Sequence, residues 1–201
     1  MTNDRIFRTI FKNMKKKKDT ESHEEFLLQE PEATYHIQSK NKLWVAYTGA
    51  GKNQESENYV KRSIALMGMS SVKPFNEVKN VNDFIYCIRE GVPKQALDNL
   101  LNVTGITVNE ITNIIRISDR TLRRYTLKQK LSAEQSERVI ELAKLYSRGE
   151  EVFGTLDAFK EWMNSTVMAL GNKKPKEFLD TSLGIEMLMD ELGRIEHGIF
   201  A

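Results

Sequence analysis

The chain has 201 residues, of which 40% are hydrophobic and 29% charged, with one cysteine and a net charge of +2. This composition is typical of a folded globular protein without disulfides, in which any nucleic-acid binding must depend on a local basic patch. No apolar run approaches the ~20 residues of a membrane-spanning helix and no secretion signal is recognisable, so we expect a cytoplasmic protein without membrane contact.

Residues 1–40 are predicted to form a flexible charged arm. The basic run Lys15–Lys18 is followed by the acidic stretch DTESHEE, and no hydrophobic period is sustained. The lysines belong either to a solvated tail or to an arm that steers a nucleic acid or a protein partner.

Residues 41–90 form an N-terminal region whose role the sequence leaves uncertain. Its first part, KLWVAYTGAGKN, has the outline of a phosphate-binding loop because two glycines and Lys52 follow a strand-like run. Such a loop, however, needs a glycine where Ala46 stands and a serine or threonine where Asn53 stands. We therefore interpret it as an extended segment that ends in a flexible turn, and a nucleotide-binding enzyme is the weakest of the functions considered.

Short amphipathic helices are expected between residues 56 and 105. The stretches ENYVKRSIALMG, NVNDFIYCIREGV and PKQALDNLLNVTG are predicted helices that stop at Gly68, Gly91 and Gly105. Pro93 suits the first turn of the third helix, since a residue there needs no backbone donor. The apolar faces of the first two stretches consist of Val60, Ile64, Met67, Phe84, Cys87 and Ile88.

The segment that starts at Thr107 predicts a helix-turn-helix. Thr107 and Glu110 have the spacing of a capping box, and Ser118 can cap a second helix a few residues after the first. Leu122 is expected to face inward from this second helix. In a helix-turn-helix the first helix braces the second, whose first turns lie in the DNA major groove. We assign residues 91–130 to this DNA-binding region.

The second helix of this pair also has a basic face. Arginine contacts phosphates or guanine edges, and threonine and tyrosine contact the DNA backbone or a base. The alternative is a basic, solvated helix in an ordinary bundle, and we favour DNA contact. The candidate DNA-binding residues are Ser118, Arg120, Thr121, Arg123, Arg124, Tyr125 and Lys128.

Two longer helical patterns follow. LSAEQSERVIELAKLYSRGEEVFG begins with the capping pair Ser132 and Gln135 and predicts a core helix. TLDAFKEWMNSTVMALG also predicts an amphipathic helix, with Thr155 or Asp157 near its N-cap. The expected fold is therefore mainly α, a helical bundle behind a flexible N-terminal arm.

The last segment predicts two short helices, at residues 175–180 and 181–193. Gly193 is expected to end the second helix, and Gly198 adds conformational freedom just before the final Ile-Phe-Ala. An apolar tip of this kind gains nothing from being ordered unless it has a partner, so we expect a tethered, mobile end that binds one.

No catalytic or metal-binding constellation is recognisable in the sequence. The histidines stand apart at positions 23, 36 and 197, and Cys87 has no partner at zinc-ligand spacing. We expect a protein without enzymatic activity, metal or cofactor.

From about Gly91 to the end, the sequence resembles the antitoxins of the Xre/MbcA/ParS family, which neutralise toxins of the RES type. The resemblance is carried by ISDRTLRRY, by LSAEQSERVIELAKLYSRGEEVFG and by AFKEWMNSTVMALGNKKPKEFLDTSLGIEMLMDELGRIEHGIFA. It implies an Xre-like helix-turn-helix that binds its own operator, followed over residues 131–201 by a helical toxin-binding domain. It also implies a homodimer that assembles with its toxin into a hetero-oligomer.

The resemblance further implies that the C-terminal segment blocks the toxin. RES-type toxins have an ADP-ribosyltransferase-like fold and consume NAD or transfer from it, and the antitoxin's end reaches the NAD-binding cleft. Apolar side chains suit the walls of such a cleft, and the Glu196 and terminal carboxylates suit its cationic groups. Arg194 and His197 either hydrogen-bond across the interface or serve as a helix-end charge and an exposed ring. The candidate toxin-binding residues are Arg194, Glu196, His197, Ile199, Phe200 and Ala201.

The predicted function is that of a type II antitoxin that blocks its toxin and represses the shared operon. The alternative is a DNA-binding transcriptional regulator without a toxin partner, which leaves the apolar tip unexplained.

Overall fold

The computed structural model describes residues 54–198, with side chains from Asn58 onward. The predicted charged arm, the KLWVAYTGAGKN segment and the candidate residues Ile199, Phe200 and Ala201 lie outside the described residues. Within residues 54–198 the chain forms helices and turns without a β-strand, so the predicted mainly α fold is confirmed.

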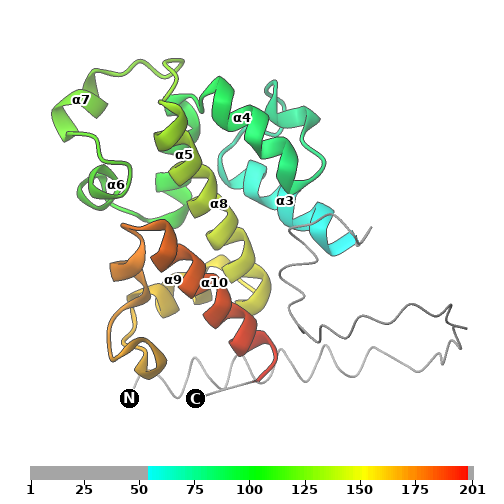
Figure 1. The fold of residues 1–201 in the computed structure, drawn as a ribbon, viewed down its shortest axis with the longest axis vertical. Coiled ribbons are helices and arrows are strands. Elements are labelled where there is room, and N and C mark those ends of the chain that lie inside the picture. Colours follow the sequence, from blue (N-terminus) through cyan, green and yellow to red (C-terminus); the bar gives the residue numbers. More distant parts are fainter. Residues whose placement is uncertain (1–53, 199–201) are drawn as a thin grey trace, which may run out of the picture. The chain divides into compact units, whose positions relative to one another are not determined.

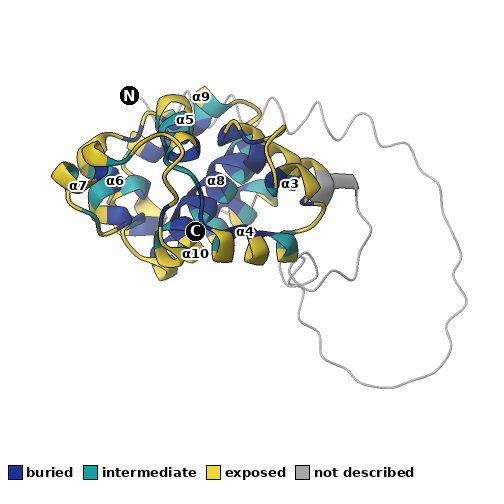
Figure 2. Cartoon of the chain, turned by 90° about the horizontal axis from the view of Figure 1, so that it is seen from above, coloured by how far each residue is buried: buried dark blue, intermediate teal, exposed yellow. Residues whose placement is uncertain are grey.

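The longest helix, α8 (Ala133–Phe153), is the axis of the bundle. Its 21 residues span about 31 Å. Figure 1 shows the other helices around it, and Figure 2 shows that its residues are mostly buried. The helices that pack against α8 are α3 (Gln54–Leu66), α4 (Phe84–Glu90), α5 (Lys94–Thr104), α9 (Leu156–Asn164) and α10 (Ser182–Glu196).

Two short helices, α6 (Val108–Ile114) and α7 (Asp119–Arg124), contact each other at one side of the bundle. Residues 115–118 connect them, as the predicted helix-turn-helix requires. Single 3₁₀ turns complete the connections elsewhere. They are η1 (Phe75–Glu77), η2 (Val81–Asp83), η3 (Met168–Leu170) and η4 (Pro175–Phe178).

The helix starts that the sequence predicted are confirmed by their caps. Thr107, Ser118 and Ser132 each accept a hydrogen bond from the backbone amide three residues ahead, as their spacing predicted. Thr155, rather than Asp157, caps α9 by accepting from the Ala158 amide. The predicted stops are also confirmed, since Gly68, Gly91 and Gly105 adopt positive φ angles.

The start of α5 is capped in a way that no local motif indicates. Its N-cap residue, Pro93, provides no side-chain hydrogen bond. The amides of Lys94 and Gln95 instead donate to the carbonyl oxygens of Gln129 and Leu127, at 2.9 Å each. The linker between α7 and α8 therefore runs back across α5 and satisfies two amides that a helix start leaves unpaired.

The helix α9 lies on α8 through an aromatic cluster of Tyr146, Phe153, Phe159 and Trp162, whose neighbouring ring centroids are 5.1–5.7 Å apart. Gly149 makes this approach possible, because a Cβ atom there would stand 2.4 Å from the ring of Phe159. Rings at these separations add to the burial energy of the cluster. The two predicted core helices, α8 and α9, therefore pack against each other at Gly149.

The end of the chain differs from the prediction in two respects. The predicted helix at 175–180 is the 3₁₀ turn η4, which ends at Phe178. The helix predicted to stop at Gly193 continues to Glu196, because Leu192 and Ile195 on either side of the glycine are buried and hold the helix against the bundle. The glycine in the left-handed conformation is Gly198, with φ of +69°.

Candidate functional sites

The first turn of α7 is organised by Ser118 and Thr121. The Ser118 hydroxyl accepts from the Thr121 amide at 3.1 Å and lies 2.7 Å from the Thr121 hydroxyl. Both hydrogen bonds lie at the surface. Leu122 is 4% exposed and fixes the helix to the bundle. The opposite face of α7 is therefore presented to solvent in a defined orientation, as a helix that enters a DNA groove must be.

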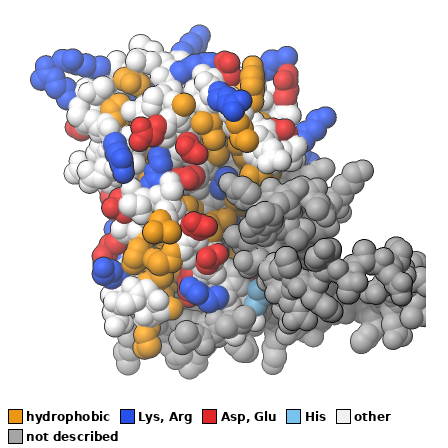
Figure 3. Space-filling model, viewed as in Figure 1, with side chains coloured by type: hydrophobic (Ala, Val, Ile, Leu, Met, Phe, Trp, Pro, Cys, Tyr) orange, Lys and Arg blue, Asp and Glu red, His pale blue; other side chains and the backbone are white. Residues whose placement is uncertain are grey.

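The basic residues of α7 differ in their pairing. Arg123 Nε donates to both carboxylate oxygens of Asp119, at 2.8 and 2.9 Å. In the described part of the chain, Arg120, Arg124 and Lys128 form no ion pair and are exposed. Figure 3 shows basic side chains projecting from the upper left of the molecule, over α7. Arg120, Arg124 and Lys128 thus offer unpaired positive charge at the surface.

Two further residues complete this surface. Tyr125 is the C-cap of α7 and is half-buried, so only part of its ring is accessible. Arg116 lies in the turn between α6 and α7 with φ of +53° and is exposed, 4.0 Å from Glu134. Arg116 is not among the residues predicted from the sequence, because it lies in the turn and not in the second helix. The feature of the sequence that could have indicated it is a basic residue two positions before the N-cap Ser118.

Two of the candidate residues at the end of α10, Arg194 and Glu196, are paired with other side chains of the protein. Arg194 Nε donates to Glu191 at 2.7 Å, and the Glu191 side chain is 8% exposed. Glu196 accepts from Arg148 on α8 at 2.5 Å, whereas the ring of His197 is exposed. The structure thus brings Arg194, Glu196 and His197 to the last turn of one helix.

Arg148 is the residue of this site that the sequence prediction missed. It lies 48 residues before Glu196, and no sequence motif indicates that the two side chains meet. Burial alone would lower the pKa of Arg148, but the hydrogen bond with Glu151 and the charges of Glu196 and Glu151 raise it above its ordinary value. Arg148 is consequently a charged residue in a partly buried position.

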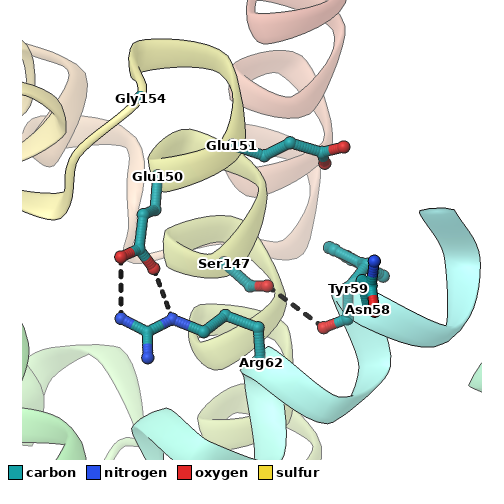
Figure 4. Close-up of a pocket in the computed structure, with 7 residues that line it drawn as sticks. All are labelled: Asn58, Tyr59, Arg62, Ser147, Glu150, Glu151 and Gly154. Atoms are coloured by element: carbon teal, nitrogen blue, oxygen red, sulfur yellow. Dashed lines mark hydrogen bonds and ion pairs between the residues drawn. The ribbon is translucent and has the colours of Figure 1, made fainter.

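A cavity of about 360 Å³ lies between α3 and α8 (Figure 4). Arg62 and Glu150 point toward each other across it, with Arg62 Nη2 and Glu150 Oε1 2.7 Å apart, and Ser147 donates to the Tyr59 carbonyl at 3.1 Å. These polar groups already have partners within the chain. The contacts therefore stabilise the packing of α3 on α8, and the cavity presents no reactive group that we can assign.

Other chemistry finds no support in the described residues. Within residues 54–198 no group of histidine, cysteine and carboxylate side chains is arranged to hold a metal ion. Burial, followed by the nearby charge of Asp83, raises the pKa of Cys87 to about 11. None of the helices described here has the length and apolarity to cross a bilayer.

Taken together, the fold and these surfaces define a helix-turn-helix DNA-binding protein with a C-terminal helical module. Residues 83–144 match the model of the antitoxin Xre-like helix-turn-helix domain, and residues 148–198 match that of the antitoxin Xre/MbcA/ParS C-terminal toxin-binding domain. The chain belongs to the Xre/MbcA/ParS antitoxin family. The resemblance deduced from the sequence motifs is therefore confirmed.

Curated relatives agree with this assignment. The chain is 32% identical over 114 residues to "Antitoxin Xre" of Photorhabdus laumondii, covering 56% of this chain and 77% of the relative. It is 30% identical over 117 residues to "Antitoxin Xre" of Yersinia enterocolitica, covering 57% and 78%. It is 29% identical over 129 residues to "Prs ADP-ribosylating antitoxin" of a Sphingobium species, covering 59% and 81%.

The matches imply a toxin partner for residues 148–198 and DNA binding for residues 83–144. The two matched ranges meet inside α8, so one continuous helix belongs to both domains. The predicted boundaries, 91–130 for the DNA-binding region and 131–201 for the toxin-binding domain, stay predictions, as do the individual contact residues.

Proposed function

We propose that this antitoxin neutralises a RES-type toxin, one that consumes NAD or ADP-ribosylates its target, by placing its C-terminal segment in the toxin's active-site cleft. The observation that carries the proposal is the geometry of α10. Its last buried side chain is Ile195, one residue before the helix ends, and the chain continues from a fixed helix toward Ile199 and Phe200. The name of the Sphingobium relative mentions ADP-ribosylation, which supports this class of toxin.

The chemistry of the segment suits a cleft shaped for a dinucleotide. Such clefts combine apolar walls with a few polar groups. Burial of Ile199 and Phe200 would contribute about 2 kcal/mol each, from which the ordering of the segment subtracts a part. Occupation of the cleft excludes NAD. The protein thus acts by binding, without enzymatic activity or a cofactor of its own.

The same protein is proposed to repress its operon in the cytoplasm. A helix-turn-helix dimer reads two half-sites about one helical turn apart, so we infer a homodimer on operator DNA that becomes a hetero-oligomer when toxin binds. The exposed cations Arg120, Arg124 and Lys128 support this role, because phosphate neutralisation supplies much of the affinity for DNA.

The test is a variant that lacks residues 199–201, co-expressed with the toxin encoded beside this gene. We expect the truncated protein to keep its helical circular dichroism and its operator binding but to lose protection of growth. Protection by the truncated protein would contradict the cleft mechanism. A matched control replaces the exposed Leu183 with serine, since Leu183 lies at the other end of α10.

A further inference from the structure

The last turn of α10 is fastened to α8 by a shared arginine. Arg148 Nη2 donates to Glu196 Oε2 at 2.5 Å, and Arg148 Nη1 donates to Glu151 Oε2 at 2.7 Å. The Arg148 side chain is 18% exposed and that of Glu196 is 30% exposed. A planar guanidinium that donates to two carboxylates has little freedom to rotate. The contact therefore fixes both the position and the direction of the Glu196 side chain.

This contact lies where α10 ends. Glu196 is the last residue of the helix, and the His197 and Gly198 amides donate to the carbonyls of Gly193 and Ile195 at 3.2 and 3.0 Å. Beyond the buried Ile195, Glu196 reaches back to α8 while the His197 side chain is exposed. The end of the helix is thus held at its final residue rather than left to fray.

The surroundings favour a strong ion pair. The Tyr59 hydroxyl is buried without a hydrogen-bond partner among the described residues, and burial raises its pKa, with the Arg148 and Glu151 charges as smaller influences. The Arg148 and Glu196 side chains are themselves only partly exposed. Charges in such a position interact more strongly than at an open surface.

We propose that Arg148 is a positioning residue for toxin neutralisation: by holding Glu196, it sets the direction in which the chain leaves α10 at His197 and Gly198. The inference rests on the proposed function, because this direction matters only when the segment enters a toxin. A segment whose base is already oriented loses less freedom on binding. Glu196 then acts as an anchor to α8.

The first experiment measures the anchor in the full-length antitoxin without toxin. Amide hydrogen exchange, followed by NMR, should become about tenfold faster at His197 and Gly198 in Arg148→Ala, which removes the hydrogen bond. It should also become faster in Glu196→Gln, which removes the carboxylate charge that strengthens this bond. The Leu188 amide, in the middle of α10, should be unaffected. The double variant Arg148→Glu with Glu196→Arg, made on a Glu151→Gln background so that two carboxylates do not face each other, should restore slow exchange, which a merely structural role of either residue would not produce.

A matched control is Arg62→Ala. It breaks another arginine–glutamate pair that ends on α8, at Glu150, without touching α10. Exchange at His197 and Gly198 should stay as in the unmodified protein. Unchanged exchange at these amides in both Arg148→Ala and Glu196→Gln overturns the inference, and Glu196→Gln keeps it testable if Arg148→Ala fails to fold.

The second experiment measures binding to the toxin encoded by the adjacent gene. Toxin affinity should fall about tenfold in Arg148→Ala, the factor expected when a charged hydrogen bond is removed, and recover in the charge-reversed double variant. Unchanged affinity despite faster exchange overturns the positioning role. Tighter binding overturns it too, since the pair would then compete with the toxin. If the variant lacking residues 199–201 still neutralises, the proposed function fails while the exchange result stands.

Discussion

Arg138 and Arg148, ten residues apart on α8, bind the two opposite ends of α10. Arg138 donates to the Ser182 hydroxyl at 2.7 Å and to the Leu179 carbonyl at 2.9 Å, at the start of α10. Arg148 donates to Glu196 at its end. The two helices therefore run in the same direction, and arginines of α8 hold both ends of α10. Figure 1 shows the two helices side by side.

The two arginines are not equivalent, because Arg138 is 9% exposed and donates to a backbone carbonyl as well as to side chains. Arg138→Ala leaves the Leu179 carbonyl without this donor and removes a charge partner of Glu141. We expect this variant to lower the free energy of unfolding by about 2–3 kcal/mol, as urea denaturation followed by circular dichroism would measure.

The control for Arg138→Ala is Arg62→Ala, whose side chain is 46% exposed. Exposed pairs contribute little, so we expect the free energy of unfolding to fall by less than about 1 kcal/mol. Equal decreases in the free energy of unfolding of the two variants would show that the hydrogen bonds of Arg138 to Leu179 and Ser182 do not contribute to stability.

The comparison of Arg138 with the helix caps shows what the sequence can predict. Thr107, Ser118 and Ser132 were identified because each cap bonds an amide three residues ahead, which is a local relationship. Arg138 meets Leu179 at a separation of 41 residues, which depends on how helices pack. Local caps and hydrophobic faces therefore predicted the mainly α fold, whereas the anchors of α10 required the structure.

The same distinction explains the error at Gly193 and the unpredicted role of the α7–α8 linker. A glycine near the end of an amphipathic pattern is a common helix stop, but burial of Ile195 carries α10 past it. The backbone of the linker TLKQKLS caps α5 at Lys94 and Gln95. Backbone bonds of this kind carry no side-chain signature, so no motif in the sequence indicates them.

DNA binding is expected to depend on the unpaired cations of α7. Replacing Arg120 and Arg124 with alanine should weaken binding to the proposed operator upstream of the gene. The slope of log affinity against log salt concentration should fall by about 2, one for each phosphate that is no longer neutralised. Fluorescence anisotropy at several salt concentrations measures both quantities. Arg123, paired with Asp119, should contribute less.

The control for this DNA titration is Arg89→Ala, which removes an exposed arginine from α4. The salt dependence of DNA binding by this control should match that of the unmodified protein. The single variants Arg120→Ala and Arg124→Ala each lose one positive charge, as the control does, so any difference depends on position and not on net charge. If the Arg120 and Arg124 variants also match it, α7 is not the DNA-contacting helix.

Gly149 offers a stability test in which the usual helix preference is reversed. Alanine normally stabilises a helix by about 1 kcal/mol relative to glycine. Gly149→Ala, however, places a Cβ atom 2.4 Å from the Phe159 ring and must displace α9. We expect the free energy of unfolding to fall by about 2–4 kcal/mol.

The matched control is Gly193→Ala, which lies inside α10. Apart from the adjoining residues and the backbone of the helix itself, no atom lies within 4 Å of the added Cβ. Its free energy of unfolding should rise by up to about 1 kcal/mol. Thermal denaturation of both variants measures the contrast, and a gain at both positions would contradict the close packing of α9 on Gly149.

Glu110 predicts a pH-dependent contribution to stability. Burial alone would raise its pKa, but hydrogen bonds from the Thr107 backbone and hydroxyl and the pair with Lys176 lower it below the ordinary value of 4.5. The carboxylate joins the capping box of α6 to η4, with Lys176 Nζ 3.3 Å away. A carboxyl group whose pKa is lower in the folded state stabilises the protein above pH 4.5, and this stabilisation disappears as the pH falls through the folded pKa.

Glu110→Gln should therefore destabilise the protein near pH 7 by about 1 kcal/mol or less, since the side chains of Glu110 and Lys176 are both more than one-third exposed. The difference between the two proteins should shrink steadily as the pH is lowered below 4.5. Urea denaturation at about pH 7, 5 and 3.5 measures this difference. A difference that stays constant over this range would mean that the Glu110 charge has no part in holding α6 to η4.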